Sequence, residues 1–213
     1  MNLGIHVRVG GRQWVALLSF VVLMSLTGAS GKQPNVLFIV VDDLRPELNC
    51  YGVDEVVSPN FDRLARMGML CERAYVQYPV CNPSRSSFLS GLRPEQTGIL
   101  SNETPFREKL GDKVSLPELF RLNGYRTGGF GKIFHKGQDE SGKPALFKDP
   151  RSWDEFYDGL RDVPRKARSG EGRNLTGGKL PWCEWRAAEG DDEELADGLN
   201  TTRALGFLAK ESP

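Results

Sequence analysis

The sequence predicts an α/β fold in which helices sandwich a mostly parallel β-sheet. Two observations point to this class. Strand-like apolar runs and capped helical segments alternate along the chain, and the first run has the composition of a strand buried on both faces. A hydrophobic content of 39% over 213 residues is enough for one sizeable core, so we expect a globular domain.

The first central strand is expected over residues 35–41, because Val, Leu, Phe and Ile follow one another there without a charge. This run leads directly into Asp42 and Asp43. A second strand is expected at residues 70–76, and a third at residues 125–130.

Helices are expected between these strands. Residues 58–68 place apolar side chains at helical spacing after Ser-Pro and before a glycine, and residues 116–124 repeat this pattern. A further helix is expected after Cys81, with Pro83 in its first turn and Gly91 just beyond its end. Strand, helix, strand, helix order is typical of an α/β sandwich.

The second half of the chain is less regular. Residues 137–190 are rich in Gly, Pro and charge, which predicts an irregular excursion that either shapes a substrate pocket or is a surface insertion. A helix that begins with acidic residues is expected over residues 191–210.

Charge and the N-terminal segment indicate the class of protein. Lys and Arg balance Asp and Glu at 28 each, which argues against nucleic acid as a partner. Residues 1–30 contain Arg8 and Arg12, an apolar run and then small residues around Ala29, the layout of a cleaved secretory signal. The alternative is an uncleaved anchor, but the run is shorter than the roughly 20 residues of a membrane span. We therefore expect an exported protein without stable membrane insertion.

One motif carries specific chemistry. It reads Cys-Asn-Pro-Ser-Arg-Ser-Ser-Phe-Leu-Ser-Gly over residues 81–91. It resembles the signature of the sulfatase family, Cys-x-Pro-Ser-Arg followed by x-x-x-Leu-Ser/Thr-Gly, at every fixed position. The resemblance implies that a separate maturation enzyme oxidises Cys81 to formylglycine. The hydrated aldehyde then offers two hydroxyls on one carbon, one to attack sulfur and one to expel sulfate.

The place of Cys81 before a helix suits an anionic substrate. Free backbone N–H groups and the positive end of the helix dipole are expected to face an anion there. Arg85 lies about one turn further on, so its guanidinium is expected to reach the same face and hold the sulfate or the nucleophile's oxygen. A surface position for Arg85 is the alternative.

Asp42 and Asp43 are metal-ligand candidates, because they follow the first expected strand at the edge where α/β sheets bind ligands. Their hard oxygens favour Ca²⁺, with Mg²⁺ as a second possibility. By the family resemblance, the residue made from Cys81 completes this part of the metal shell. The alternative is that the two carboxylates only cap the next helix.

A second motif, Gly-Tyr-Arg-Thr-Gly-Gly-Phe-Gly-Lys-Ile-Phe-His over residues 124–135, resembles the second sulfatase signature. By that resemblance Lys132 binds the sulfate, and His135 contacts the formylglycine hydroxyl as a base for the elimination step. A histidine satisfied within the core is the alternative for His135.

The four cysteines are expected to form at most one disulfide. An even count in an exported protein ordinarily suggests two bridges. Conversion of Cys81 leaves Cys50, Cys71 and Cys183, so at least one of these is expected to keep a buried thiol.

The resemblance covers residues from about Asn35 to the end of the chain and is greatest to the iduronate-2-sulfatase branch. It implies an alkaline-phosphatase-like domain, here an incomplete N-terminal part over residues 31–213, and a sulfated sugar as substrate. Further metal and sulfate ligands come from later positions in the family, so we expect the chain alone to be inactive. The expected location is periplasmic or extracellular, or lysosomal in a eukaryote.

Two other functions remain open at this stage. Some relatives in the same superfamily carry the same modified cysteine and hydrolyse phosphonate or phosphate monoesters. A non-catalytic relative that only binds glycans would instead keep an unmodified thiol at Cys81.

Overall fold

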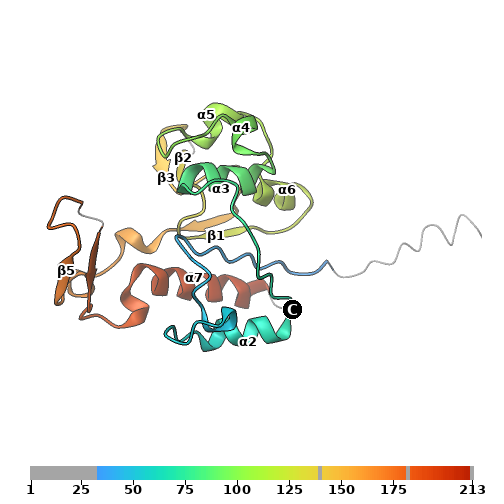
Figure 1. The fold of residues 1–213 in the computed structure, drawn as a ribbon. Helices are drawn as coiled ribbons and strands as arrows, with labels where there is room; N and C mark the ends of the chain where they lie inside the picture. Colours follow the sequence, from blue (N-terminus) through green and yellow to red (C-terminus); the bar gives the residue numbers. More distant parts are fainter. Residues whose placement is uncertain (1–32, 139–140, 181–182, 212–213) are drawn as a thin grey trace, which may run out of the picture. The chain divides into compact units, whose positions relative to one another are not determined.

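The computed structural model describes residues 33–138, 141–180 and 183–211 (Figure 1). The chain divides into two units, one that ends at Ile39 and one that begins at Val40. All the helices and strands described below belong to the second unit. The predicted signal, residues 1–30, lies outside the described residues.

The helices are α2 (Pro59–Met67), α3 (Cys81–Ser90), α4 (Pro94–Thr97), α5 (Phe106–Leu110), α6 (Leu116–Leu122) and α7 (Ala196–Glu211). The 3-10 turns are η1 (Asn49–Tyr51), η2 (Gly159–Arg161), η3 (Lys166–Arg168) and η4 (Asp192–Glu194). The strands are β1 (Gly128–Phe130), β2 (Lys136–Gln138), β3 (Pro144–Leu146), β4 (Glu155–Tyr157), β5 (Gly172–Asn174) and β6 (Glu184–Arg186). The four predicted helices are confirmed, although the last begins later than expected because η4 precedes it.

Local signals explain where two of these helices begin and end. Helix α3 ends at Gly91, which adopts a left-handed φ of 69° and donates its N–H to the Ser87 carbonyl at 2.8 Å. Helix α6 begins with a capping box: the Ser115 hydroxyl accepts from the Glu118 amide, and the Glu118 carboxylate accepts from the Ser115 amide, both at 3.3 Å. The residues that bond at each helix end lie three or four positions apart, so the sequence alone could indicate where these helices begin and end.

The parallel element of the fold is the pair β1–β4, in register from Gly128 opposite Glu155 to Phe130 opposite Tyr157. Parallel strands need a long crossover connection, and residues 131–154 supply it. The pairs β2–β3 and β5–β6 are antiparallel. The strand predicted at 125–130 is confirmed only in its second half, and residues 137–190 contain more regular structure than predicted.

Two predicted strands are wrong. Residues 35–41 and 70–76 form no strand in the structure, and their side chains are exposed, with Phe38 at 58%, Ile39 at 63% and Tyr75 at 83%. The physical reason is that an apolar run becomes a strand only when neighbouring strands accept its ladder hydrogen bonds. Among the described residues, no strand lies alongside either run.

The core connects helix α3 to the loop that follows β1. Leu89 of α3, Phe106 of α5 and Phe134 of the loop form one buried cluster. The rings of Phe106 and Phe134 meet edge to face, with centroids 5.1 Å apart. In Figure 1, α3 lies beside α4 and α6. Burial of Phe134 therefore fixes the backbone of the residues on either side of it.

Helix α7 supports the other end of the same loop. Phe207 packs its ring on Phe130 of β1, with centroids 5.7 Å apart, and α7 lies beside β1 in Figure 1. Gly131 follows with φ +80°, and an added Cβ there would lie 2.8 Å from the Asn200 side-chain nitrogen. Only glycine fits this turn without strain, and Lys132 is the next residue.

Candidate active site

The site begins at Cys81, the first residue of α3. Its thiol Sγ donates a hydrogen bond to Oδ1 of Asp42 at 3.6 Å, although the two residues are 39 positions apart in sequence. Cys81 is half-buried. The structure thus brings the predicted nucleophile position against one of the two predicted metal carboxylates.

Arg85, one turn along α3, ties the helix to both other parts of the site. Its side chain is 5% exposed, and one nitrogen of its guanidinium pairs with Oδ2 of Asp42 at 3.2 Å. Another nitrogen donates to the backbone carbonyls of Lys132 and Ile133, the second at 3.0 Å. A charged group this buried needs such partners, so the surface alternative for Arg85 is wrong.

Lys132 completes the charge cluster, because its ammonium pairs with Oδ2 of Asp42. Partial burial raises the pKa of Asp42, but the hydrogen bond from Lys132 and the positive charges of Arg85 and Lys132 outweigh this effect. The pKa of Asp42 is therefore lowered, and the carboxylate stays ionised at neutral pH. Arg85 and Lys132 together carry one positive charge more than Asp42 alone, which suits an anion, and the neighbouring Asp43 carboxylate adds a negative charge beside them.

His135 lies in the same electrostatic neighbourhood. Burial, followed by the positive charges of Lys132, Lys136 and Arg85, lowers its pKa, against the opposing effect of Asp42. The imidazole is thus neutral at pH 7 and able to accept a proton. Its Nδ1 is buried and has no hydrogen-bond partner among the described residues.

Asp43 is placed differently from its neighbour. Its backbone adopts φ +54°, in the left-handed region that Asp tolerates better than most residues. In the described part of the chain, the hydrogen bonds and ion pairs of the site reach Asp42 and not Asp43. The alternative that the two carboxylates cap a helix is also wrong, since the next helical turn, η1, begins at Asn49.

The described residues fit a divalent cation in kind but not in number. Carboxylate oxygens of Asp42 and Asp43 are the hard ligands that Ca²⁺ and Mg²⁺ prefer, and position 81 adds a third candidate. However, no group of three or more His, Cys, Asp or Glu side chains in the described ranges could hold a metal ion. A calcium shell takes 6–8 oxygens, so most of the ligands must come from elsewhere.

The backbone at the start of α3 is less open to an anion than predicted. The Asn82 amide donates to Oδ1 of Asn102 at 3.0 Å, the Ser84 amide donates to the Val80 carbonyl at 3.1 Å, and Pro83 has no N–H. The prediction of several free N–H groups is therefore wrong. An anion at this helix end must be held mainly by the side chains of the charge cluster.

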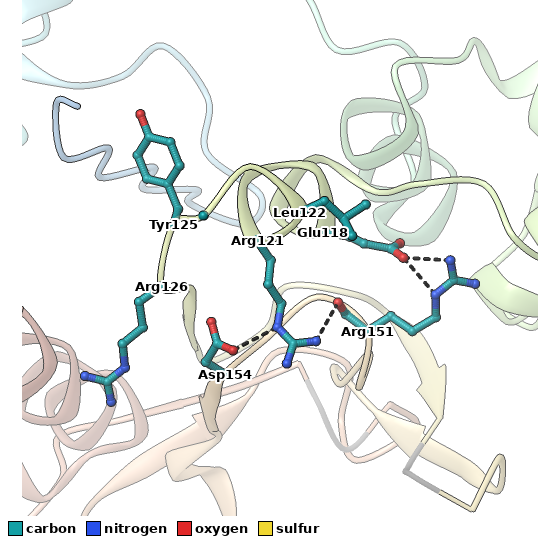
Figure 2. A pocket seen from close by; sticks show the side chains of 8 residues that line it. Glu118, Arg121, Leu122, Tyr125, Arg126, Arg151 and Asp154 are labelled. Atoms are coloured by element: carbon teal, nitrogen blue, oxygen red, sulfur yellow. Dashed lines mark hydrogen bonds and ion pairs between the residues drawn. The ribbon is translucent and has the colours of Figure 1, made fainter. Parts of the chain in front are cut away.

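A hollow of about 770 Å³ lies elsewhere and contains none of the predicted site residues (Figure 2). Figure 2 shows two of its arginines held by carboxylates: Arg121 reaches Asp154 at 2.8 Å, and Arg151 reaches Glu118 at 2.6 Å. These pairs neutralise much of the positive charge in the hollow. We therefore assign the chemistry to the cluster around Asp42.

Glu118 also belongs to a buried ion cluster. Arg107 pairs with Glu118 at 2.8 Å and with Asp149 at 2.6 Å, and it donates to the carbonyls of Gly111 and Lys113. All three charged side chains are 6% exposed or less. This cluster joins α5 and α6 to the segment before β4, and no local sequence pattern predicts it.

The four cysteines, all in the described part of the chain, carry free thiols. Cys71 is exposed, whereas Cys50, Cys81 and Cys183 are half-buried. Free thiols are compatible with at most one disulfide, but the expected buried thiol is wrong, because none of Cys50, Cys71 and Cys183 is buried.

With this geometry in view, comparisons with known proteins identify the family. The family model described as Sulfatase matches residues 34–206, most of the chain. The chain belongs to the sulfatase family. This membership, together with the parallel pair β1–β4, confirms the predicted α/β class.

Several sulfatases of known name are similar to the chain. Iduronate 2-sulfatase of Mus musculus is 47% identical over 180 residues, which cover 83% of this chain and 32% of that protein. Iduronate 2-sulfatase of Homo sapiens is 48% identical over 103 residues, 48% of this chain and 19% of that protein. A sulfatase of Formosa agariphila is 44% identical over 110 residues, 48% of this chain and 22% of that protein. The chain thus spans about a fifth to a third of the length of these sulfatases.

Within residues 33–138, 141–180 and 183–211, none of the helices combines the length and the apolar character needed to cross a bilayer.

Proposed function

We propose that the protein is a sulfuric ester hydrolase that removes sulfate from a sulfated carbohydrate, with a nucleophile made from Cys81. The observation that supports this most strongly is the convergence of Cys81, Arg85 and Lys132 on Asp42. It gives a nucleophile position beside two cations, which suits attack on a sulfate ester. The similarity to two iduronate 2-sulfatases favours a sulfated uronic acid or a related sugar as substrate.

In the proposed reaction, a maturation enzyme first oxidises Cys81 to formylglycine, and water adds to the aldehyde to give two hydroxyls on one carbon. One hydroxyl oxygen attacks sulfur and loses its proton, the bond from sulfur to the sugar oxygen breaks, and the sugar oxygen takes up a proton from solvent and leaves as an alcohol. Loss of the second hydroxyl proton reforms the aldehyde and breaks the bond from carbon to the sulfate oxygen. Sulfate leaves without any attack of water on sulfur.

The chain's own side chains have distinct proposed roles in these steps. Lys132 and Arg85 hold sulfate oxygens and balance the charge that develops on them. His135 accepts the second hydroxyl proton, which its neutral state allows. Asp42, Asp43 and residue 81 contribute to holding a divalent cation, Ca²⁺ or Mg²⁺, which when bound would polarise a sulfate oxygen and make the hydroxyl more acidic.

The wider setting follows from the same proposal. Residues 1–30 act as a secretory signal, and residues 31–213 form part of the catalytic domain. The mature enzyme works outside the cytoplasm, in a periplasm, outside the cell or in a lysosome. Its partners are the maturation enzyme and the sulfated sugar.

The test combines mass spectrometry with hydrolysis by the protein from its own host. The peptide that contains residue 81 is expected to be about 18 Da lighter than the unmodified thiol peptide, the difference for thiol-to-aldehyde oxidation. Aryl sulfate is expected to be hydrolysed in preference to aryl phosphate. Cys81→Ala is expected to abolish hydrolysis, whereas Cys71→Ala, a control at an exposed thiol, is expected to retain it.

Three results would redirect the proposal. An intact thiol at Cys81 with glycan binding but no turnover would indicate a non-catalytic glycan-binding protein. A strong preference for phosphate esters would indicate a phosphate or phosphonate monoesterase. Hydrolysis of sulfate esters that survives Cys81→Ala would refute the assigned nucleophile.

A further inference from the structure

The start of helix α3 lacks a cap of its own. The residue before it, Val80, has no polar side chain, so the first turn of the nucleophile helix is not held by the usual Ser, Thr, Asp or Asn. An uncapped first turn frays, and Cys81 is the residue that would move. Another part of the chain must therefore hold this turn.

The loop over residues 101–104 provides that support. Oδ1 of Asn102 accepts the Asn82 amide at 3.0 Å, the bond that a capping residue would normally make. In return, the side-chain nitrogen of Asn82 donates to the carbonyls of Ser101 at 2.8 Å and Thr104 at 2.7 Å. Asn82 is only 1% exposed. Helix and loop thus hold each other through three hydrogen bonds, two of which the buried Asn82 side chain donates.

We propose that Asn102 is a positioning residue for the nucleophile: it caps helix α3 from a distant loop and so fixes residue 81 against Asp42. Asn82, next to residue 81, locks the loop in the position from which Asn102 acts. This role rests on the proposed function only where catalysis is the readout. The hydrogen bonds themselves can be tested whether or not the protein hydrolyses sulfate esters.

The chemistry explains why such support matters. A nucleophile misplaced by about 1 Å can lose about a hundredfold in rate, whereas substrate held by side chains elsewhere is affected less. Loss of the Asn102 cap is therefore expected to lower kcat more than it raises KM. A residue that served only overall stability would shift the unfolding midpoint without this split.

The test compares three variants in the whole protein. Asn102→Ala removes the acceptor, Asn102→Asp keeps an acceptor oxygen at the same place, and Asn123→Ala is a matched control. Asn123 also bonds a helix end, donating its side-chain N–H to the Leu119 carbonyl at 2.8 Å, but it follows the last residue of α6 and is exposed. Hydrogen exchange at the Asn82 amide and steady-state kinetics are measured for each.

For Asn102→Ala, exchange of the Asn82 amide is expected to accelerate roughly fivefold, in line with the loss of one helix cap. Its kcat is expected to fall about tenfold, with KM within about threefold of the parent. Asn102→Asp is expected to restore both the slow exchange and kcat, and Asn123→Ala to change neither.

Two outcomes overturn the role of Asn102: unchanged Asn82 exchange in Asn102→Ala, or an equal loss of kcat in the Asp and Ala variants. Absence of sulfate-ester hydrolysis in the parent protein would instead defeat the proposed function. In that case the exchange data alone still decide whether Asn102 caps α3. The two failures are therefore distinguishable.

Discussion

Removal of the Arg107 guanidinium is expected to lower the free energy of unfolding more than removal of an exposed arginine guanidinium from the same region. Arg107 pairs with Glu118 and Asp149, and the three side chains are 6% exposed or less. In Arg107→Met, Glu118 keeps Arg151, but Asp149 loses its only cationic partner among the described residues. An uncompensated buried charge of this kind costs about 3–5 kcal/mol.

The control is Arg121→Met. Arg121 pairs with Asp154 at a similar distance of 2.8 Å, but the two side chains are 43% and 31% exposed. A solvent-screened pair contributes about 0–1 kcal/mol, and Asp154 keeps its hydrogen bonds from Thr127. The contrast therefore compares a buried ion cluster with a solvent-screened pair under the same substitution; the two arginines differ in burial and in their number of partners.

The assay is urea denaturation followed by circular dichroism. With a slope of about 2 kcal/mol per molar urea, Arg107→Met is expected to lower the midpoint by roughly 1.5–2.5 M, and Arg121→Met by less than about 0.5 M. The double variant Arg107→Met with Asp149→Leu is expected to regain part of the loss, because it removes the stranded charge. Equal midpoint shifts for the two single variants would refute the reasoning.

Three further predictions concern the site. The His135 imidazole is expected to titrate below its ordinary value of 6.5 in an NMR pH series, because burial and nearby cations favour its neutral form. Since the unfolded state then binds the proton more tightly, His135 makes the unfolding free energy fall as pH drops below 6.5, and a His135→Gln variant should lack this dependence. Gly131→Ala is expected to cost about 1–2 kcal/mol, measured by thermal unfolding, because φ is +80° and the new Cβ would lie 2.8 Å from Asn200. The chain alone is expected to bind Ca²⁺ weakly, since no three His, Cys, Asp or Glu side chains of its described residues are grouped so that they could hold a metal ion; a submicromolar affinity by calorimetry would contradict this.

The helices could be predicted because their signals are local. Pro83 and Gly91 bracket α3, and Ser115 caps α6, so each boundary depends on residues within one turn of it. The strand predicted at 35–41 depended instead on partners far along the chain. Its composition is suited to a buried strand, but composition does not supply the neighbouring backbone that a ladder requires.

The residues of the site could be predicted from the sequence, but the hydrogen bonds that connect them could not. The two motifs named Cys81, Arg85, Lys132 and His135, and the structure brings the first three to Asp42. The bonds from Arg85 to the loop carbonyls had no signal in the sequence, because any residue supplies a carbonyl.

The Asn82–Asn102 pair was missed for a related reason. Asn82 occupies the variable position of the first motif, where no side chain is specified. Asn102 lies 20 residues further on in a loop without a motif of its own. Side chains that act on a distant backbone leave no periodic pattern, so only the folded structure identifies them.

The buried cluster of Leu89, Phe106 and Phe134 has a consequence for heat inactivation of the protein. Leu89 and Phe134 sit behind the two segments that carry the reactive groups, so neither segment can loosen while the cluster remains intact. Heat inactivation should then coincide with cooperative melting instead of preceding it, and an inactive yet still folded form should not accumulate.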